Sequence, residues 1–495
     1  MNPIKLIFSC VAFTWCASAA AAAEARPNFV FIIGDDISGE DFGCYGNPGI
    51  RTPNIDRLAA EGLRFTNIYL TASSCSPSRS SIITSRYPHN LETAAELHGV
   101  FPAGVAMFPK LLRDAGYHTI HSGKAHFGTT SDKLDGPAAA AFVVGGDGER
   151  DDLKGGHGGE NRWIEHLRAR PKDKPFFTWF ASHDAHRPWD ADSFVGLNRP
   201  ADVRVPAYLV DTPETRIDLA HYYDEITRLD HYVGEVIREL ARQKVLEQTV
   251  IIFMADNGRP FPHSKTQLYE DGIKPPLIIR WPAGIPRPAR TDSLVSSLDI
   301  APTVLELAGI ARSESFQGVS LLPLLRDPTA TVRDFVFAEH NWHNFAAHVR
   351  MVRHGNYVYM RNAWPHLPEP GASDTFYNPS ADALKALRAQ GKLTPLQANV
   401  FQVPRPTEEF FDLAADPGQE RNLAVGPTPP AALARLRADL TRWTNETGDT
   451  VPVKPTPSNV IFETGEKTPE FWRGDAPGAS AHAVGINAPG PVRDR

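Results

Sequence analysis

The sequence predicts an α/β protein in which helices cover both faces of a β-sheet. Four apolar, β-rich runs indicate the sheet, at residues 28–33, 117–121, 175–180 and 249–254. Continuous apolar strands of this kind are typical of a sheet that is buried on both faces. Helical patterns lie between these runs, at residues 52–61, 108–115 and 216–242. This alternation of strands and helices indicates the α/β class.

A smaller second unit is predicted after the main domain. Shorter alternating strands at residues 335–338 and 357–361 indicate an antiparallel sheet, and a helix is expected near residues 431–446. We therefore divide the chain into a main domain at residues 24–330 and a C-terminal α+β subdomain at residues 331–446. Residues 447–495 are rich in proline, glycine and alanine and are expected to wrap loosely around the rest or to be partly disordered.

Residues 1–23 predict a cleavable signal peptide. Lys5 supplies the positive charge, residues 6–15 form the apolar stretch, and residues 17–23 form the small-residue cleavage zone. No later apolar run reaches the ~18 residues of a membrane span. We therefore expect export to the periplasm or the extracellular space. The mature chain would keep Cys44 and Cys75, which could form one disulfide, unless one of them does chemistry.

Composition and charge exclude several classes of protein. Hydrophobic residues make up 42% and charged residues 22% of the 495 residues, so the chain can bury a sizeable core and is not a disordered or fibrous protein. The formal net charge is −7, without a long basic run. A nucleic-acid partner is therefore not expected, because phosphate binding needs a concentrated basic surface. The oligomeric state does not follow from the sequence.

Polar side chains follow each of the four predicted strands. They are Asp35 and Asp36, then Lys124 and His126, then His183 and His186, and finally Asp256 and Asn257. Ligands of open α/β sheets gather beyond the carboxyl ends of the strands. A polar loop is the better interpretation of any one of these runs taken alone. Four such runs together favour a functional site.

The acidic residues predict a cation site. Asp35, Asp36 and Asp256 would repel one another strongly if they came together without a cation. With Asn257 they form an all-oxygen ligand set, which suits Ca²⁺ or Mg²⁺ better than zinc. Either pair alone would more often form a turn or a helix cap.

The most informative motif is Ser74-Cys75-Ser76-Pro77-Ser78-Arg79-Ser80. Pro77 can open a helix, and the N-terminus of that helix would stabilise negative charge near Cys75. Arg79 would lie one turn further along, on the same face. A structural cysteine is normally buried and inert, whereas Cys75 lies among serines. We therefore expect Cys75 to do chemistry and Cys44 to be a buried structural thiol.

These residues resemble the signature of the type I sulfatases, carried here by Cys75-x-Pro77-x-Arg79. The resemblance extends to Asp35-Asp36, Gly123-Lys124, Asp256-Asn257-Gly258 and residues 52–58 and 411–413. It implies an alkaline-phosphatase-like fold, with a large mixed sheet between helices and a smaller C-terminal domain. It also implies that a maturation enzyme oxidises Cys75 to Cα-formylglycine, whose hydrate is the nucleophile.

Within that family the chain is most similar to the N-sulfoglucosamine sulfohydrolases, or heparan N-sulfatases, and their bacterial relatives. The similarity rests on residues 74–79, 183–187 and 256–262. Lys265 departs from it, because an arginine is expected there and many O-sulfatases carry lysine. The implied substrate is a sulfated sugar or glycosaminoglycan of the N-sulfoglucosamine type, with another O-sulfated polysaccharide as the alternative.

The resemblance also implies a role for each site residue. Asp35, Asp36, Asp256, Asn257 and an oxygen of modified Cys75 would hold the cation, Ca²⁺ or alternatively Mg²⁺. Arg79 would stabilise the nucleophile, and Lys124, His186 and Lys265 would bind the sulfate oxygens. His186 or Lys265 would protonate the leaving group, and His126 would be the base that helps to expel sulfate.

Less specific candidates and other functions stay open at this point. His98, His340 and Arg350 are expected to line the substrate pocket, and His183 to support the site. One alternative function is a phosphonate or phosphodiester hydrolase of the same superfamily. Asn257 is evidence against this alternative. The other is a non-catalytic glycan-binding protein with unmodified Cys75. A pure binder would have no need of an activated nucleophile with its metal set.

Overall fold

The structure is a computed structural model. It describes residues 26–130, 134–145, 160–285, 287–426, 430–469, 471–475, 478–479 and 483–494. The predicted signal peptide at residues 1–23 lies outside these ranges. Among the helices of the described ranges, none combines the length and the apolar character that crossing a membrane requires.

The large sheet contains all four predicted strands. They are β1 (Asn28–Gly34), β4 (His118–Gly123), β5 (Phe176–Ala181) and β6 (Thr249–Ala255), which lie parallel in the order β4-β5-β1-β6. The sheet continues with β7 (Leu277–Arg280), β2 (Leu63–Phe65) and β8 (Ala289–Thr291). Strand β7 is antiparallel to both of its neighbours. The predicted α/β fold with a large mixed sheet is therefore confirmed.

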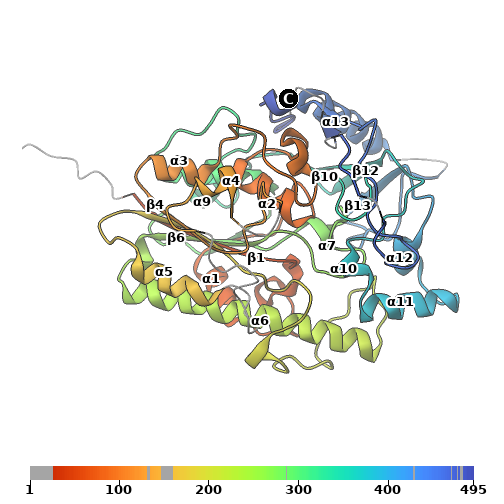
Figure 1. The fold of residues 1–495 in the computed structure, drawn as a ribbon, viewed down its shortest axis with the longest axis horizontal. Coiled ribbons are helices and arrows are strands. Elements are labelled where there is room, and N and C mark those ends of the chain that lie inside the picture. Colours follow the sequence, from red (N-terminus) through yellow and green to blue (C-terminus); the bar gives the residue numbers. More distant parts are fainter. Residues whose placement is uncertain are drawn as a thin grey trace, which may run out of the picture.

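Helices cover both faces of this sheet (Figure 1). On one face lie α1 (Pro53–Glu61), α5 (Trp163–Ala169) and α6 (Pro213–Arg242). On the other lie α2 (Cys75–Thr84), α3 (Phe108–Asp114) and α8 (Ile300–Leu307). The helical patterns predicted from the sequence correspond to α1, α3 and α6.

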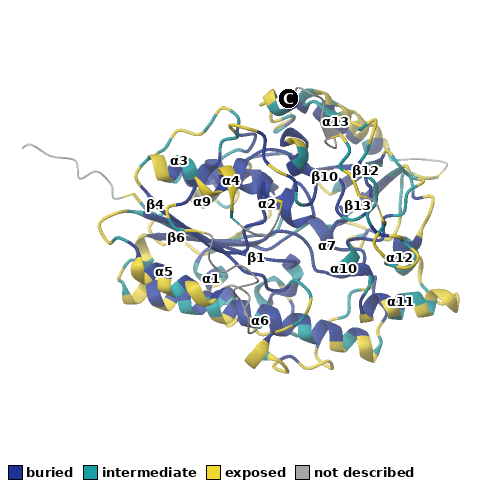
Figure 2. Cartoon of the chain, viewed as in Figure 1, coloured by how far each residue is buried: buried dark blue, intermediate teal, exposed yellow. Residues whose placement is uncertain are grey.

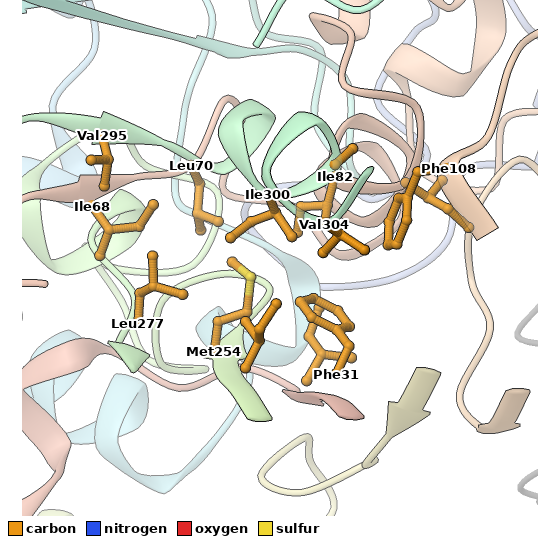
Figure 3. Close-up of a cluster of buried hydrophobic side chains, with 14 of the residues drawn as sticks. Phe31, Ile68, Leu70, Ile82, Phe108, Met254, Leu277, Val295, Ile300 and Val304 are labelled. Carbon is orange, nitrogen blue, oxygen red and sulfur yellow. The ribbon is translucent and has the colours of Figure 1, made fainter. Parts of the chain in front are cut away.

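Burial on both faces explains why the strands are continuously apolar. Successive side chains of a strand point to opposite faces, so Phe31 joins the core beneath α2, α3 and α8, while Ile32 joins the core beneath α6. Figure 3 shows Phe31 and Met254 facing Ile300 and Val304 of α8. Figure 2 shows buried residues running through the strands, with exposed residues on the outer sides of the helices.

The C-terminal subdomain contains a four-stranded antiparallel sheet, as expected. Its strands are β10 (Phe335–His340), β11 (Val349–His354), β12 (Tyr357–Asn362) and β13 (Glu408–Asp412), in that order. Helix α13 (Ala431–Thr447) covers one face, where Trp443 stacks on Phe337 with ring centroids 5.0 Å apart.

The remaining α-helices and strands of the described ranges complete the fold. The helices are α4 (Gly136–Ala139), α7 (Glu270–Ile273), α9 (Leu322–Arg326), α10 (Ser373–Phe376), α11 (Pro379–Ala389) and α12 (Pro395–Ala398). The strands are β3 (Ile68–Tyr69), β9 (Val295–Ser296), β14 (Asp449–Thr450) and β15 (Gly478–Ala479).

The described part of the C-terminal extension is held by specific hydrogen bonds. Arg86, just after α2, donates to the carbonyls of Val484 and Ile486 at 2.7 and 3.0 Å. The amide of Asp334 donates to the carbonyl of Val492 at 2.8 Å. The described part of the extension is therefore anchored both to the main domain, through Arg86, and to the C-terminal subdomain, through Asp334.

Candidate active site

Cys75 is the first residue of helix α2, and its side chain is 1% exposed. Ser74, in the N-cap position, makes no side-chain cap to the helix; its hydroxyl lies 2.8 Å from Nδ1 of His343. The positive end of the helix dipole is therefore directed at residue 75. Burial raises the pKa of the Cys75 thiol well above its ordinary value. The unmodified thiol therefore stays protonated and is a poor nucleophile.

The predicted cation ligands meet at the carboxyl ends of β1 and β6. These strands are neighbours, with Gly34 opposite Ala255, so Asp35-Asp36 and Asp256-Asn257 lie side by side. The amide of Asp36 donates to Oδ1 of Asp256 at 3.1 Å. Nδ2 of Asn257 donates to Oδ1 of Asp36 at 2.6 Å, and Oδ1 of Asp36 is also 3.8 Å from the Cys75 sulfur. The structure thus brings together the whole predicted ligand set.

Three cationic side chains surround these carboxylates. Arg79 donates through Nε to Oδ2 of Asp256 at 2.7 Å, and Lys124 is ion-paired with Asp35. Nζ of Lys265 lies 2.7 Å from Oδ2 of Asp36. All three cations are buried. Their pairing explains how so many charges can share one water-poor site.

Burial and neighbouring charges move the pKa values of the carboxylates in different directions. Burial acts to raise the pKa of Asp35, but Lys124 and Arg79 outweigh it and hold that pKa well below its ordinary value. Burial raises the pKa of Asp36 to about 6 and that of Asp256 to about 7. For Asp36 and Asp256, the positive charges of the protein alone therefore do not offset the effect of burial on the pKa.

The donor set fits a hard divalent cation. The ligand atoms of Asp35, Asp36 and Cys75 lie within 4.8 Å of one another. Oδ1 of Asn257 is buried and has no hydrogen-bond partner among the described residues, as expected of an oxygen reserved for a ligand. Carboxylate and amide oxygens are the ligands that Ca²⁺ and Mg²⁺ prefer.

The histidines of the site have different environments. Nδ1 of His186 lies 2.5 Å from the carbonyl of Arg187, and Nε2 lies 3.9 Å from Oδ2 of Asp36. Burial, followed by Lys265, lowers the pKa of His186 to about 4. The neutral ring therefore carries its proton on Nδ1, which assigns a lone pair to Nε2. Nε2 of His126 lies 3.1 Å from Nδ1 of His98, so these two rings form a pair.

The remaining predicted residues have mainly structural contacts. Arg350 binds Asp449 through Nε at 2.6 Å and lies 3.7 Å from Glu339. His340 lines a small buried cavity of about 10 Å³. The backbone carbonyl of His183 accepts a hydrogen bond from the amide of His186 at 2.8 Å. Substrate binding by these residues stays a prediction.

Two site residues were not predicted from the sequence. Asp374, in α10, lies 2.9 Å from Nζ of Lys265 and 3.6 Å from Nε2 of His186. His343 bonds Ser74 beside the nucleophile position. Both belong to the C-terminal subdomain and lie in no recognisable motif, so only the tertiary structure identifies them. Cys44 is partly buried and, like Cys75, is a free thiol.

Comparison with known proteins identifies the family. The sulfatase family model matches residues 27–310, and the model "N-sulphoglucosamine sulphohydrolase, C-terminal" matches residues 262–361. The chain is 30% identical to human N-sulphoglucosamine sulphohydrolase over 483 residues, which cover 89% of this chain and 94% of that protein. It is 29% identical to an ulvan-active sulfatase of Formosa agariphila, covering 86% of this chain and 76% of the relative.

Solved structures agree in fold. One neighbour is a 2-O GAG sulfatase, with a TM-score of 0.62 and 21% sequence identity, and the match covers 86% of this chain and 93% of that chain. The arrangement of Cys75, Arg79 and the carboxylates thus lies in a fold that known sulfatases share. The chain therefore belongs to the sulfatase family and is a sulfuric ester hydrolase.

Proposed function

We propose that this protein is an exported sulfatase that removes the N-linked sulfate of glucosamine units in sulfated sugars or glycosaminoglycans. The observation that carries the reaction class is the position of Cys75, at the start of buried helix α2 and against Asp36. The substrate is supported by the 30% identity to human N-sulphoglucosamine sulphohydrolase and by the match of residues 262–361 to its C-terminal model. Export is supported by the signal-peptide pattern of residues 1–23.

Conversion of Cys75 to formylglycine is the first part of the proposal. The buried thiol, with its raised pKa, would be a weak nucleophile. Oxidation to an aldehyde would supply a hydrated carbonyl that can attack sulfur and later release sulfate. Arg79 lies on the same helix with its guanidinium between Asp256 and Asp35. It would hold negative charge next to residue 75.

The divalent cation is the second part. Asp35, Asp36, Asp256 and Asn257 would hold it, and we propose Ca²⁺, with Mg²⁺ as the alternative, because every side-chain ligand offers a hard oxygen and both ions prefer such ligands. When bound, the ion would supply stabilisation of a negatively charged oxygen. The four site carboxylates, including Asp374, outnumber the cations Arg79, Lys124 and Lys265 by one. A divalent ion would make the site positive overall, as sulfate binding requires.

Lys124, Lys265 and His186 would contact the sulfate and its leaving atom. Charge on sulfate oxygens must be held through the transition state, and the two buried ammonium groups are suited to do so. Lys265 keeps its proton because its carboxylate neighbours raise its pKa well above the ordinary value despite burial. In the neutral tautomer His186 has no proton on Nε2. In the protonation state of the free enzyme, Lys265 is therefore a better proton donor to the leaving group than His186.

The pair His126–His98 would act when sulfate is expelled. A hydrogen bond between two imidazoles needs one donor and one acceptor, so at least one ring nitrogen of the pair carries hydrogen. His126 could pass a proton to His98, which is partly exposed. This supports the assignment of His126 as the base.

An O-sulfatase acting on another polysaccharide is the second candidate. It is favoured by Lys265, which stands where an arginine is expected in an N-sulfatase, and by the similarity to the ulvan-active sulfatase. The chemistry of the site would be the same, with an oxygen leaving atom in place of nitrogen.

Sulfate release distinguishes these candidates. Matured enzyme with Ca²⁺ would be given glucosamine carrying only an N-sulfate, the matched sugar carrying only a 6-O-sulfate, and bis(4-nitrophenyl) phosphate, after mass spectrometry of residue 75. We expect formylglycine at residue 75 and release from the N-sulfated sugar, with Cys75→Ala inactive. Release from the 6-O-sulfated sugar alone would favour the O-sulfatase. Hydrolysis of the phosphodiester alone would contradict both. An unmodified thiol in an inactive protein that still binds the sugars would favour the glycan-binding alternative.

A further inference from the structure

We propose that Asp374 is a specificity-determining residue of the substrate site. Its carboxylate would accept a hydrogen bond from the sugar hydroxyl next to the sulfated position, and it would disfavour sugars that carry a second sulfate at that hydroxyl. This inference rests on the proposed function, because it assigns part of the same substrate site.

Among the carboxylates of the described site, Asp374 is the one that comes from the C-terminal subdomain, where it lies in α10. It is partly open to solvent. Its side chain is 23% exposed, the same fraction as that of His186, whereas Lys265 between them is 1% exposed. In Figure 1, α10 lies at the junction between the main domain and the C-terminal subdomain. The partly exposed pair of His186 and Asp374 therefore forms the solvent side of the site, where the sugar must lie while its sulfate faces Lys265.

The carboxylate has a free acceptor for the sugar. Among the described residues, both ion-pair contacts of Asp374 are made by Oδ2, which lies 2.9 Å from Nζ of Lys265 and 3.6 Å from Nε2 of His186. The second oxygen, Oδ1, can accept from a hydroxyl or N–H group. It cannot bind sulfate, because two anions repel. A carboxylate beside the sulfate-binding cations is therefore suited to the uncharged, donor-bearing part of the substrate.

The surrounding structure holds Asp374 in place. The amide of Ser373 donates to Oδ1 of Asn344 at 2.9 Å, and Nδ2 of Asn378 donates to the carbonyl of Asp374 at 3.0 Å. The next turn is anchored by Phe376, which is buried against Phe401. A carboxylate fixed in this way costs little further ordering when a ligand binds, so it can contribute to selectivity.

Two other roles are less consistent with these contacts. Asp36, His186 and Asp374 bring possible ligand atoms within 4.8 Å of one another. However, the Lys265 ammonium already bridges the two carboxylates, and it would repel a second metal ion. Alternatively, Asp374 could act only by positioning Lys265. That role would affect all substrates equally, which gives a clear distinction from a role in selectivity.

The test measures binding without turnover, in the full-length protein carrying Cys75→Ser and loaded with Ca²⁺. Calorimetry would give the Kd of N-sulfoglucosamine and of the same sugar with an additional 3-O-sulfate, on the hydroxyl next to the sulfamate. With Asp374 present we expect the singly sulfated sugar to bind about tenfold more tightly, the size expected for repulsion at a partly exposed site. Asp374→Asn keeps the shape and removes the charge, and it should reduce the preference to within about twofold. Asp374→Ala should do the same.

The matched control is Asp382→Asn, on helix α11, where the side chain is 69% exposed and pairs with Lys385. It should leave the preference unchanged. An unchanged preference in Asp374→Asn, an equal loss of affinity for both sugars, or no binding of either sugar before Asp374 is changed would each overturn the assignment. Sulfate release by the matured enzyme is a separate measurement, so failure of the proposed N-sulfatase activity would be seen independently of the binding ratio.

Discussion

Arg79 donates through Nε to Oδ2 of Asp256 at 2.7 Å, and neither side chain is exposed to solvent. The contact joins the nucleophile helix α2 to the carboxyl end of β6, although the two residues are 177 positions apart in the chain. Nη2 of the same guanidinium lies 3.7 Å from Oδ1 of Asp35, at the end of β1. One side chain therefore fixes residue 75 relative to both strand ends that supply the cation ligands.

The first prediction concerns this guanidinium. Arg79→Lys keeps the charge but loses the forked geometry that reaches two carboxylates. We expect kcat/KM for sulfate release to fall by about 10²–10³-fold, the range seen when one stabilising donor is removed from an anionic transition state. Arg57→Lys is the control, since Arg57 is 61% exposed and forms an ion pair with Glu61 on the same helix, away from the site. A loss of less than about threefold in Arg79→Lys would contradict the assigned role.

The second prediction concerns the pH dependence of cation binding. The raised pKa values of Asp36, about 6, and Asp256, about 7, mean that the folded, metal-free protein binds protons there more tightly than the unfolded chain. Their contribution to stability is therefore present at low pH and is lost as pH rises through 6 to 7. Ca²⁺ must displace these protons, so its affinity should increase over the same range.

Thermal unfolding with and without saturating Ca²⁺ checks this expectation. The increase in Tm on adding Ca²⁺ should be larger at pH 8 than at pH 5. Chelation at pH 8 should lower the Tm and abolish sulfate release. Asp256→Asn removes one of the two titrating groups and should weaken the pH dependence. An equal stabilisation by Ca²⁺ at both pH values would contradict the prediction.

The third prediction tests proton donation by Lys265. Lys265→Ala should lower kcat/KM by about 10²–10⁴-fold on a sugar sulfamate, whose nitrogen needs a proton to leave. It should lower kcat/KM much less on 4-nitrophenyl sulfate, because nitrophenolate leaves without protonation. His186→Asn should lower kcat/KM by similar factors on both substrates, since neutral His186 lacks a proton on Nε2. Equal losses on both substrates in Lys265→Ala would contradict the role of proton donor and leave Lys265 as a sulfate-binding group.

The fourth prediction concerns Arg228, which supports the site from helix α6. Its Nη2 and Nε lie 2.5 and 2.8 Å from the two carboxylate oxygens of Asp184, and Nη2 also lies 2.9 Å from Glu225. The backbone of Asp184 in turn accepts from the amide of Asp35 at 2.7 Å. Arg228→Met would leave buried carboxylates unpaired, at a cost of about 3–5 kcal/mol in the free energy of unfolding.

Urea unfolding of Arg228→Met measures that cost, and sulfate release should fall with it because Asp35 loses its support. The matched control on the same helix is Arg238→Met, since Arg238 is 56% exposed and pairs with Glu235. Its effect should be within about 0.5 kcal/mol. A loss of less than about 1 kcal/mol in Arg228→Met would show that the buried acids are neutralised in another way.

Features carried by neighbouring residues of the chain were predictable from the sequence, whereas contacts between distant segments were not. The apolar runs predicted β1, β4, β5 and β6, because burial on both faces leaves a continuous local pattern. The parallel pairing of β1 with β6 then brought together Asp36 and Asp256 as expected. Arg350 shows where a local signal ends: its expected place in the substrate pocket stays a prediction, and its ion pairs with Asp449 and Glu339 were visible only in the tertiary structure.

The sequence by itself determined the α/β class, the sulfatase signature around Cys75 and Arg79, and the residues at the strand ends, because each is carried by neighbours in the chain. Only the tertiary structure decided that Asp374 joins Lys265 and His186, and that His343 bonds Ser74. Asp374 lies in the four-residue helix α10 and His343 in a loop, both in the C-terminal subdomain and outside any recognisable motif. Their positions depend on how the two units pack, and long-range packing leaves no periodic signal in a single sequence.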